Sequence, residues 1–187
     1  MEHTQAATKA GFKYHLEHIR KIAVMEEMGL SIEGLERRGD SVVLSTEDVS
    51  NLIPTEGLNY MLGATLTGVT QLSSWYIALF EGNYTPVAGV TAATFPAAAT
   101  ESTAYAEATR VAWVPGAIAA GSVSNTASKA VFTMNATKTI YGIAQSSAAT
   151  KSTTTGTLIS VAAFSVAKAV VATDILNVTS TIAATSV

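Results

Sequence analysis

From residue 74 onward, the chain is a succession of short segments rich in β-branched and aromatic residues, each closed by Gly, Pro, Asn or a Ser-Thr cluster. Such side chains favour strands, and the closing residues favour turns. The pattern predicts strands at 74–81, 107–114, 117–124, 128–135, 138–145, 156–164, 166–172 and 174–182. Strands at this spacing are typical of antiparallel sandwiches, jelly rolls and barrels. We therefore predict a mainly β protein with an antiparallel β-sandwich or jelly-roll-like body.

The first of these strands, WYIALF at 75–80, is apolar on both faces. Alternate side chains of a strand point to opposite faces, which gives the two sets Trp75-Ile77-Leu79 and Tyr76-Ala78-Phe80. A strand with one face in water alternates apolar and polar residues, so this strand needs cover on both sides. We expect the first set to fill the sandwich and the second to be covered by a helix or by the N-terminal segment.

A helix is predicted at about 55–67, because Glu56 suits the first turn and Leu58, Met61, Leu62 and Leu66 form an apolar stripe. We expect it to pack across one face or one end of the sandwich. Residues 87–106 are Ala-rich, include Pro96 and are too long for a tight turn, so we expect an extended loop there.

Charge divides the chain into two unlike parts. Residues 1–60 hold ten of the fourteen acidic residues, six of the eleven basic residues and all three histidines. An ordinary soluble surface is about 25–35% charged, so the later part is solvated by hydroxyl groups or covered by other protein. We therefore divide the chain into an N-terminal arm at 1–50 and a β-sandwich domain at 51–187.

The arm is predicted to contain a helix at Ala23–Met28, a second helix at Ile32–Arg38 and a strand at 41–46. The segment FKYHLEHIRKI fits either a strand or a helix. Its apolar side chains could lie over a neighbouring subunit or complete its sheet. The residues predicted to bind a partner are Phe12, Tyr14, Leu16, Ile19, Ile22 and Met25.

Composition argues against several functional classes. The net charge of −3 argues against nucleic acid as the main partner, because phosphate binding needs a basic surface. No apolar run approaches the length of a membrane span, and no secretory leader is recognisable, so we expect assembly in a cytosol. The chain has no cysteine, which excludes disulfides and thiolate sites.

Catalytic or metal-binding patterns are weak. The carboxylate pairs Glu81–Glu101 and Glu107–Asp174 could serve a glycosidase only if a cleft brought them together, and charged turn residues are the simpler interpretation. His15, Glu17 and His18 lack a further ligand at a convincing spacing. We therefore expect no catalytic residue, no cofactor and no metal. Trp75 or Tyr84 could stack on a sugar, although aromatic residues at strand spacing usually belong to the core.

Four ordered segments resemble a family of small structural proteins of tailed bacteriophages. They are NLIPTEGLNYMLGATLTG, WYIALFEGNYTP, TFPAAATESTAYAEATRVAW and KTIYGIAQSS, and the likeness spans roughly residues 51–180. The matching elements are Asn51 to Asn59, Trp75 to Phe80, Thr94 to Trp113, and Lys138 to Gly142. The segment from Lys21 to Asp48 departs from the family, because it is longer and richer in helix signals than the corresponding segment of the family's members.

The resemblance implies a virion component without enzymatic activity. A capsid decoration (cement) protein fits best: a small β-sandwich, often trimeric, that binds over joints between major capsid subunits and stabilises the head. Its expected partners are the major capsid protein, other virion proteins and further copies of itself, without nucleic acid or membrane. The alternatives are a tail, head–tail connector or fibre-base protein of the particle and, in another class, a carbohydrate-binding module.

Overall fold

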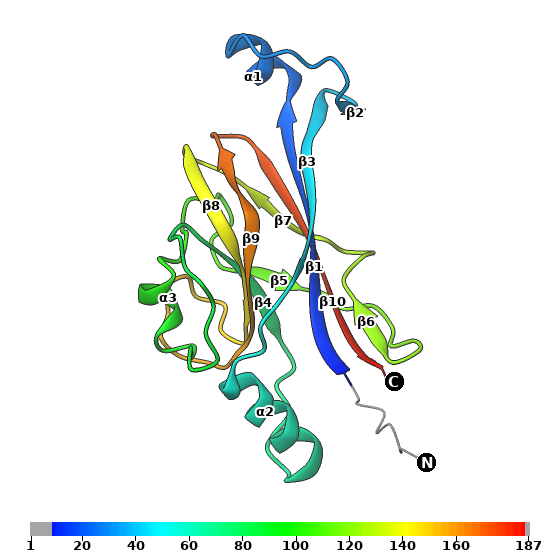
Figure 1. Cartoon of the computed structure of the whole chain (residues 1–187), viewed down its shortest axis with the longest axis vertical. Helices are drawn as coiled ribbons and strands as arrows, with labels where there is room; N and C mark the ends of the chain where they lie inside the picture. The colour runs from blue at the N-terminus through cyan, green and yellow to red at the C-terminus, as the bar shows by residue number, and fades with distance from the viewer. Residues whose placement is uncertain (1–8, 186–187) are drawn as a thin grey trace, which may run out of the picture.

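The computed structural model describes residues 9–185 as two antiparallel sheets packed face to face (Figure 1). The first sheet has the order β2 (Glu36–Arg38), β3 (Ser41–Ser50), β1 (Lys9–Lys21), β10 (Ile175–Thr185) and β6 (Ser122–Ser124), with β7 (Ala130–Thr133) also paired to β10. The second sheet has the order β5 (Val111–Trp113), β4 (Trp75–Phe80), β8 (Lys138–Ser146) and β9 (Leu158–Val170). The prediction of a mainly β protein with an antiparallel sandwich is confirmed.

The main core lies between the two sheets. Ile77 and Leu79 of β4 are fully buried in it, and Trp75 packs against its margin. Leu16 of β1 and Val178 of β10 reach it from the other sheet. The prediction that the Trp75 face of the strand fills the sandwich is therefore confirmed.

The opposite face of β4 is covered by the segment 87–106, which contains the short helix α3 (Phe95–Ala98). Phe80 is fully buried there, with its ring centroid 6.1 Å from that of Phe95 in an edge-to-face arrangement. Gly142 on the neighbouring strand makes room for the Phe80 ring, because a Cβ atom at this position would lie 2.2 Å from it. The expectation of cover by the 55–67 helix or by the N-terminal segment was wrong, since apolar residues of the long loop provide it.

The helix predicted at about 55–67 is α2 (Thr55–Leu66), and it lies at one end of the sandwich (Figure 1). Its first turn packs on β9, where a Cβ atom at Gly57 would lie 2.9 Å from the backbone of Ile159. The Glu56 carboxylate accepts hydrogen bonds from the backbone N–H groups of Ala92 and Leu158, both at 2.8 Å. The first turn of the helix is therefore anchored on β9 and on the segment 87–106.

Residues 9–50 do not form a separate arm. β1 is a central strand, paired with β10 from Lys9↔Thr185 to Ile19↔Ile175 and with β3 on its other side. Its alternating apolar residues therefore face the core of their own chain. Of the six residues predicted to bind a partner, Phe12, Tyr14, Leu16, Ile19 and Met25 are buried within the chain, and Ile22 is half-buried. The first eight residues of the predicted arm lie outside the described residues.

Between β1 and β3, the chain forms a hairpin that projects beyond the sandwich (Figure 1). It begins with α1 (Ile22–Glu27), which confirms the first predicted helix, and returns through β2. The second predicted helix, Ile32–Arg38, was wrong. Gly34 adopts a φ of 78°, a left-handed conformation that interrupts a helix, and residues 36–38 pair with β3 instead.

The remaining predicted strands are present with altered lengths. The segment 107–114 contributes only the three residues of β5. Just before them, the Arg110 side chain is buried in an ion pair with Glu101. The segments 156–164 and 166–172 form one long strand, β9, whose pairing with β8 shifts register between Ile140 and Gly142. The strand predicted at 41–46 extends to Ser50 as β3.

Candidate interaction surfaces

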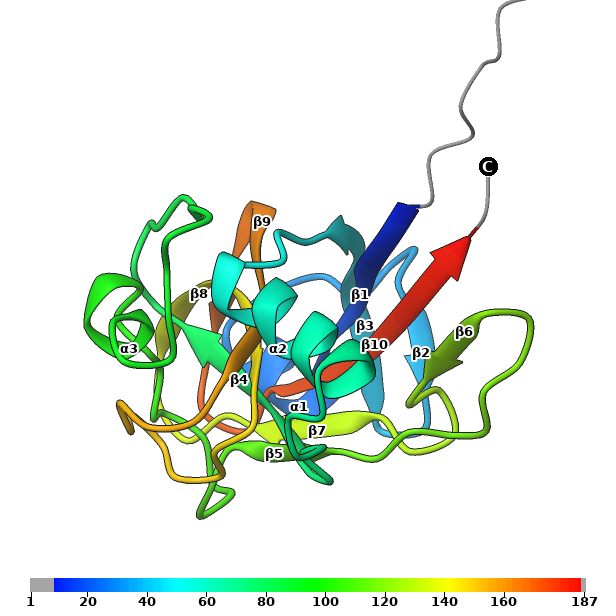
Figure 2. The ribbon, with the colours of Figure 1, turned by 90° about the horizontal axis from the view of Figure 1, so that it is seen from below.

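Three described segments at one end of the molecule contain no charged residue. Here lie α2 from Gly57 onward, the connection 67–74 and the segment 114–123 that leads into β6 (Figure 2). We call these residues the uncharged end. Six of its large apolar side chains are exposed to solvent: Leu58, Leu62, Leu66, Val69, Val114 and Ile118. Exposed apolar groups gathered in this way mark binding surfaces more often than isolated ones do.

Three leucines form a continuous line on α2. Leu58, Leu62 and Leu66 follow one another at intervals of four residues, so they lie on one helix face, and their exposed fractions rise from 44% to 57% and 73%. We call this line the leucine ridge. The sequence identified these residues as part of an apolar stripe, and the structure leaves them exposed. Contact with the body is made through Gly57 and Tyr60 instead.

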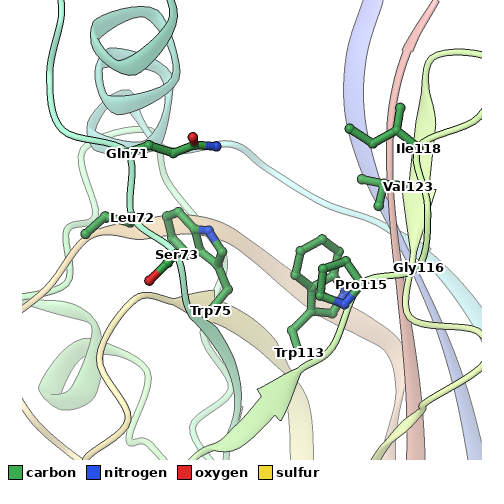
Figure 3. Close-up of a pocket in the computed structure, with 9 residues that line it drawn as sticks. All are labelled: Gln71, Leu72, Ser73, Trp75, Trp113, Pro115, Gly116, Ile118 and Val123. Atoms are coloured by element: carbon green, nitrogen blue, oxygen red, sulfur yellow. The ribbon is translucent and has the colours of Figure 1, made fainter.

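A cavity of about 310 Å³ opens between the connection 71–75 and the segment 113–123 (Figure 3). Its lining consists of Gln71, Leu72, Ser73, Trp75, Trp113, Pro115, Gly116, Ile118 and Val123. Figure 3 shows Trp75 on one side, Ile118 and Val123 on the other, and Trp113 with Pro115 between them, while Gln71 extends along the rim. We call this cavity the tryptophan pocket.

The tertiary structure fixes both tryptophans. Trp75 and Trp113 are direct partners across β4 and β5, and the Trp113 indole N–H donates to the Ser180 carbonyl at 3.2 Å. The Tyr60 ring lies edge-on to Trp75, with 5.5 Å between centroids, and its hydroxyl accepts the Leu72 N–H at 2.6 Å. The pocket is therefore preformed. Its walls are largely apolar and carry no charge, so an uncharged, largely apolar group suits it.

The opposite end of the molecule is the hairpin of residues 21–40, which we call the projecting hairpin. Its exposed charged side chains are Lys21, Glu26, Glu27, Glu33, Glu36, Arg37, Arg38 and Asp40. Met28 and Leu30 are exposed among them, at 47% and 44%. Mixed charge around a few apolar side chains is typical of the rim and centre of a protein contact.

Buried charged groups lie in the sandwich at the base of this hairpin. Asp174 has no exposed surface and accepts two hydrogen bonds from Arg20, at 2.7 and 2.6 Å, and pairs with His18 Nε2 at 2.8 Å. Burial tends to raise the pKa of Asp174, but the bonds from Arg20 and His18 outweigh it and lower the pKa.

Glu17 makes a second buried connection. Its carboxylate contacts Lys129 at 2.7 Å and Arg38 at 2.9 Å. Burial tends to raise the pKa of Glu17, yet the bonds from Lys129, Arg38 and Asn177 lower it to about 2.

The structure separates the residues considered as metal ligands. His15 bonds to Asp48 at 2.8 Å on an exposed part of the sheet, whereas His18 bonds to the buried Asp174. Glu17 is occupied by the two cations described above. Within residues 9–185 we find no group of three or more His, Asp or Glu side chains placed to hold a metal ion.

The carboxylates considered for a glycosidase each have their own partners. Glu101 is buried in a two-bond pair with Arg110, at 2.8 and 2.6 Å, and Glu81 binds Lys138 and Ser102. Glu107 accepts the Thr133 N–H. None of these carboxylates lines the tryptophan pocket.

The two candidate sugar-stacking residues have different surroundings. Tyr84 packs edge-to-face on Phe80, with 6.2 Å between centroids. Trp75 is half-buried and lines the pocket. Trp113, which completes the pocket, was not identified from the sequence, because only strand pairing brings it beside Trp75.

No family model and no curated protein matches the sequence. Among the described residues, no helix is both long enough and apolar enough to cross a membrane.

Proposed function

We propose that the protein is a non-enzymatic structural protein of a tailed bacteriophage particle, and that within the particle it acts as a capsid decoration (cement) protein. The observation that carries this proposal is the uncharged end, which carries both the exposed leucines of α2 and a largely apolar pocket. Such a surface is suited to burial against another protein. The resemblance of residues 51–180 to small phage structural proteins indicates the kind of assembly, which is a tailed phage particle.

A cement protein stabilises a shell by adding buried interface across joints between subunits. One specific contact usually buries about 1,200–2,000 Å², and a copy that contacts several subunits gains further by multivalency. The two ends of this molecule offer two such contacts. In our proposal the projecting hairpin reaches the major capsid protein, where its exposed charges can pair with the shell and Met28 and Leu30 can be buried.

Quantitative mass spectrometry of purified virions from the source of the sequence tests the proposal. A decoration protein is expected at hundreds of copies per particle, in fixed proportion to the major capsid protein. A dozen or a few dozen copies would favour the head–tail connector, tail or fibre-base alternative. Absence of the chain from purified virions would overturn the proposed function.

A binding test assigns the capsid contact to the projecting hairpin. Particles that lack the protein are mixed with the full chain or with a variant carrying Met28→Glu and Leu30→Glu. We expect the variant to keep its fold and to lose particle binding, because both side chains are exposed in the free protein. Val87→Glu is a matched control, since Val87 is also exposed, at 53%, and lies outside the hairpin.

A carbohydrate-binding module remains the second candidate, and the position of Trp75 in the pocket favours it. Indole rings stack on sugars, and the Gln71 amide at the rim could bond to hydroxyl groups. A glycan array screened with the purified protein tests this function. Binding that is lost on Trp75→Ala but kept on Tyr84→Ala would support it, and an array without binding would remove it.

A further inference from the structure

Three side chains with complementary chemistry meet on neighbouring strands of the first sheet. Glu17 of β1 and Asn177 of β10 are direct partners in the strand register. Lys129 immediately precedes β7 and lies diagonal to Asn177, because Val131 is the direct partner of Asn177. Diagonal neighbours across a sheet are about 7–8 Å apart, which is within reach of a long side chain. Strand pairing therefore brings an amine, an amide and a carboxylate together.

The two nitrogen atoms contact the same carboxylate oxygen. Lys129 Nζ donates to Glu17 Oε2 at 2.7 Å, and Asn177 Nδ2 donates to the same atom at 3.4 Å. Arg38 binds the other oxygen, Oε1, at 2.9 Å, so Oε2 is left to the amine and the amide. Of the side-chain carboxylates in residues 9–185, only Glu17 contacts both a lysine and an amide side chain.

The site is partly shielded from solvent. The Glu17 side chain is 6% exposed and that of Lys129 is 33% exposed, while Asn177 is half-buried. Groups that a fold holds in contact react far more readily than the same groups free in solution. The chain has no cysteine, so a covalent link between its strands cannot be a disulfide.

We propose that Lys129 and Asn177 form an isopeptide bond within the chain, with Glu17 as the base. Lys129 Nζ attacks Asn177 Cγ, and Glu17 Oε2 takes the proton from the attacking nitrogen. The Cγ–Nδ2 bond then breaks, and the two protons given up by the Lys129 ammonium convert the departing NH₂ group to an ammonium ion. The products are one secondary amide and one ammonium ion, so the reaction needs no oxidant and no further reactant.

The bond forms slowly and once in each chain, so it involves no enzymatic turnover. Burial tends to raise the pKa of Glu17, but the bonds from Lys129, Arg38 and Asn177 lower it to about 2, and so acidic a carboxylate is a weak base. A freshly made chain therefore holds the ion pair, and the bonded form accumulates with time. The bond ties β7 to β10 and closes a loop of about fifty residues, which restricts the unfolded chain.

Intact-mass spectrometry of the purified chain tests the proposal without any particle. We expect fresh protein to have the mass of its sequence. After several days of incubation of the folded chain, a species lighter by one ammonia should accumulate. Proteolysis of that species should yield a branched peptide that joins Lys129 to Asn177, identified by fragmentation in the mass spectrometer.

Three variants remove one participant each. Lys129→Arg keeps a positive charge beside Glu17 but has no amine to acylate, and Asn177→Ala removes the amide, so both should keep their full mass. Glu17→Gln retains both reactants and should form the bond at least about a hundredfold more slowly, because the base is missing. Circular dichroism checks that each variant is folded.

Lys138→Arg is the matched control. Lys138 pairs with Glu81, whose other side-chain partner is the Ser102 hydroxyl, so no amide is available there. This variant should lose ammonia at the same rate as the wild type.

The proposal is overturned if the incubated wild type keeps its full mass, or if the lighter species yields no branched peptide. A loss of ammonia that persists in Lys129→Arg would also overturn it, because an asparagine can lose ammonia by cyclising on its own backbone. If a variant does not fold, the branched peptide of the wild type still decides the question. None of these results bears on the number of copies in virions, so this bond and the proposed function are tested separately.

Discussion

The projecting hairpin and the uncharged end lie at opposite ends of one sandwich and are attached to it by different interactions. The hairpin is an extension of β1 and β3, and ion pairs lie at its base, with Asp174 and Glu17 as the acceptors. The uncharged end is held by close backbone packing at Gly57 and by contacts among aromatic rings. One end should therefore respond to pH, and the other to changes in side-chain volume.

The largest effect is expected from Asp174→Ala. Arg20 and His18 would then lie buried without their carboxylate, and the Val171 N–H would lose its acceptor. Breaking a buried pair in this way costs about 3–5 kcal/mol. Urea unfolding followed by circular dichroism measures the change. Asp48→Ala is the control, because its pairs with Lys13 and His15 are exposed and should contribute less than about 1 kcal/mol.

Acid should destabilise the protein through the base of the hairpin. The pKa of Glu17 falls from 4.5 to about 2 on folding, so its contribution is fully present above pH 4.5 and is lost as the pH falls toward 2. We expect a loss on the order of 2 kcal/mol, because Lys129 and Arg38 are partly exposed. Unfolding free energies measured from pH 6 to pH 2 test this.

The Glu17→Gln variant is the control for the pH series. It should be less stable at pH 6 and show a shallower decline below pH 4.5, since the titrating carboxylate is gone. An unchanged slope would show that the Glu17 connection does not contribute to acid sensitivity.

Packing should dominate at the other end, where Gly57→Ala tests the attachment of α2. The added Cβ atom would lie 2.9 Å from the Cα and carbonyl oxygen of Ile159, and backbone atoms cannot move aside easily. Overpacking of this kind costs about 1–3 kcal/mol. Thermal unfolding should show the loss at every pH. Gly89→Ala should have little effect, because nothing lies within 4 Å of its position.

The smallest change is expected from Leu62→Ala, measured at a protein concentration where the chain is a monomer. Leu62 is exposed at 57%, so the unfolding free energy should change by less than about 0.5 kcal/mol. Leu79→Ala, at a fully buried position, should cost about 2–5 kcal/mol. A large loss from Leu62→Ala would show that the ridge packs on its own body, and would remove the contrast between the two ends.

Local patterns predicted much of the fold. The antiparallel sandwich, the helices at 22–27 and 55–66, and the burial of Ile77 and Leu79 follow from periodicity and turn residues. The secondary structure of residues 12–22 could not be decided from the local sequence, because both a strand and a helix place its apolar residues on one face. Pairing with β3 and β10 decided it in favour of a strand.

The candidate interaction surfaces could be predicted less well. The leucine stripe of α2 was visible, but its direction depends on Gly57 meeting the backbone of Ile159, a contact about a hundred residues away in the chain. The tryptophan pocket depends on the register that places Trp75 opposite Trp113. Neither relation leaves a local signal, so the sequence did not show that the apolar stripe would be an exposed ridge.

By itself, the sequence determined that the chain forms strands, that WYIALF is covered on both faces, and that charge is concentrated before residue 60. These properties depend on side-chain chemistry and spacing along the chain. The tertiary structure decided that the loop at 87–106 provides the cover, that the expected arm is a central strand, and that the two uncharged segments meet at one end. Such outcomes depend on contacts between residues distant in sequence, where the cost of closing loops and the fit of side chains select one arrangement.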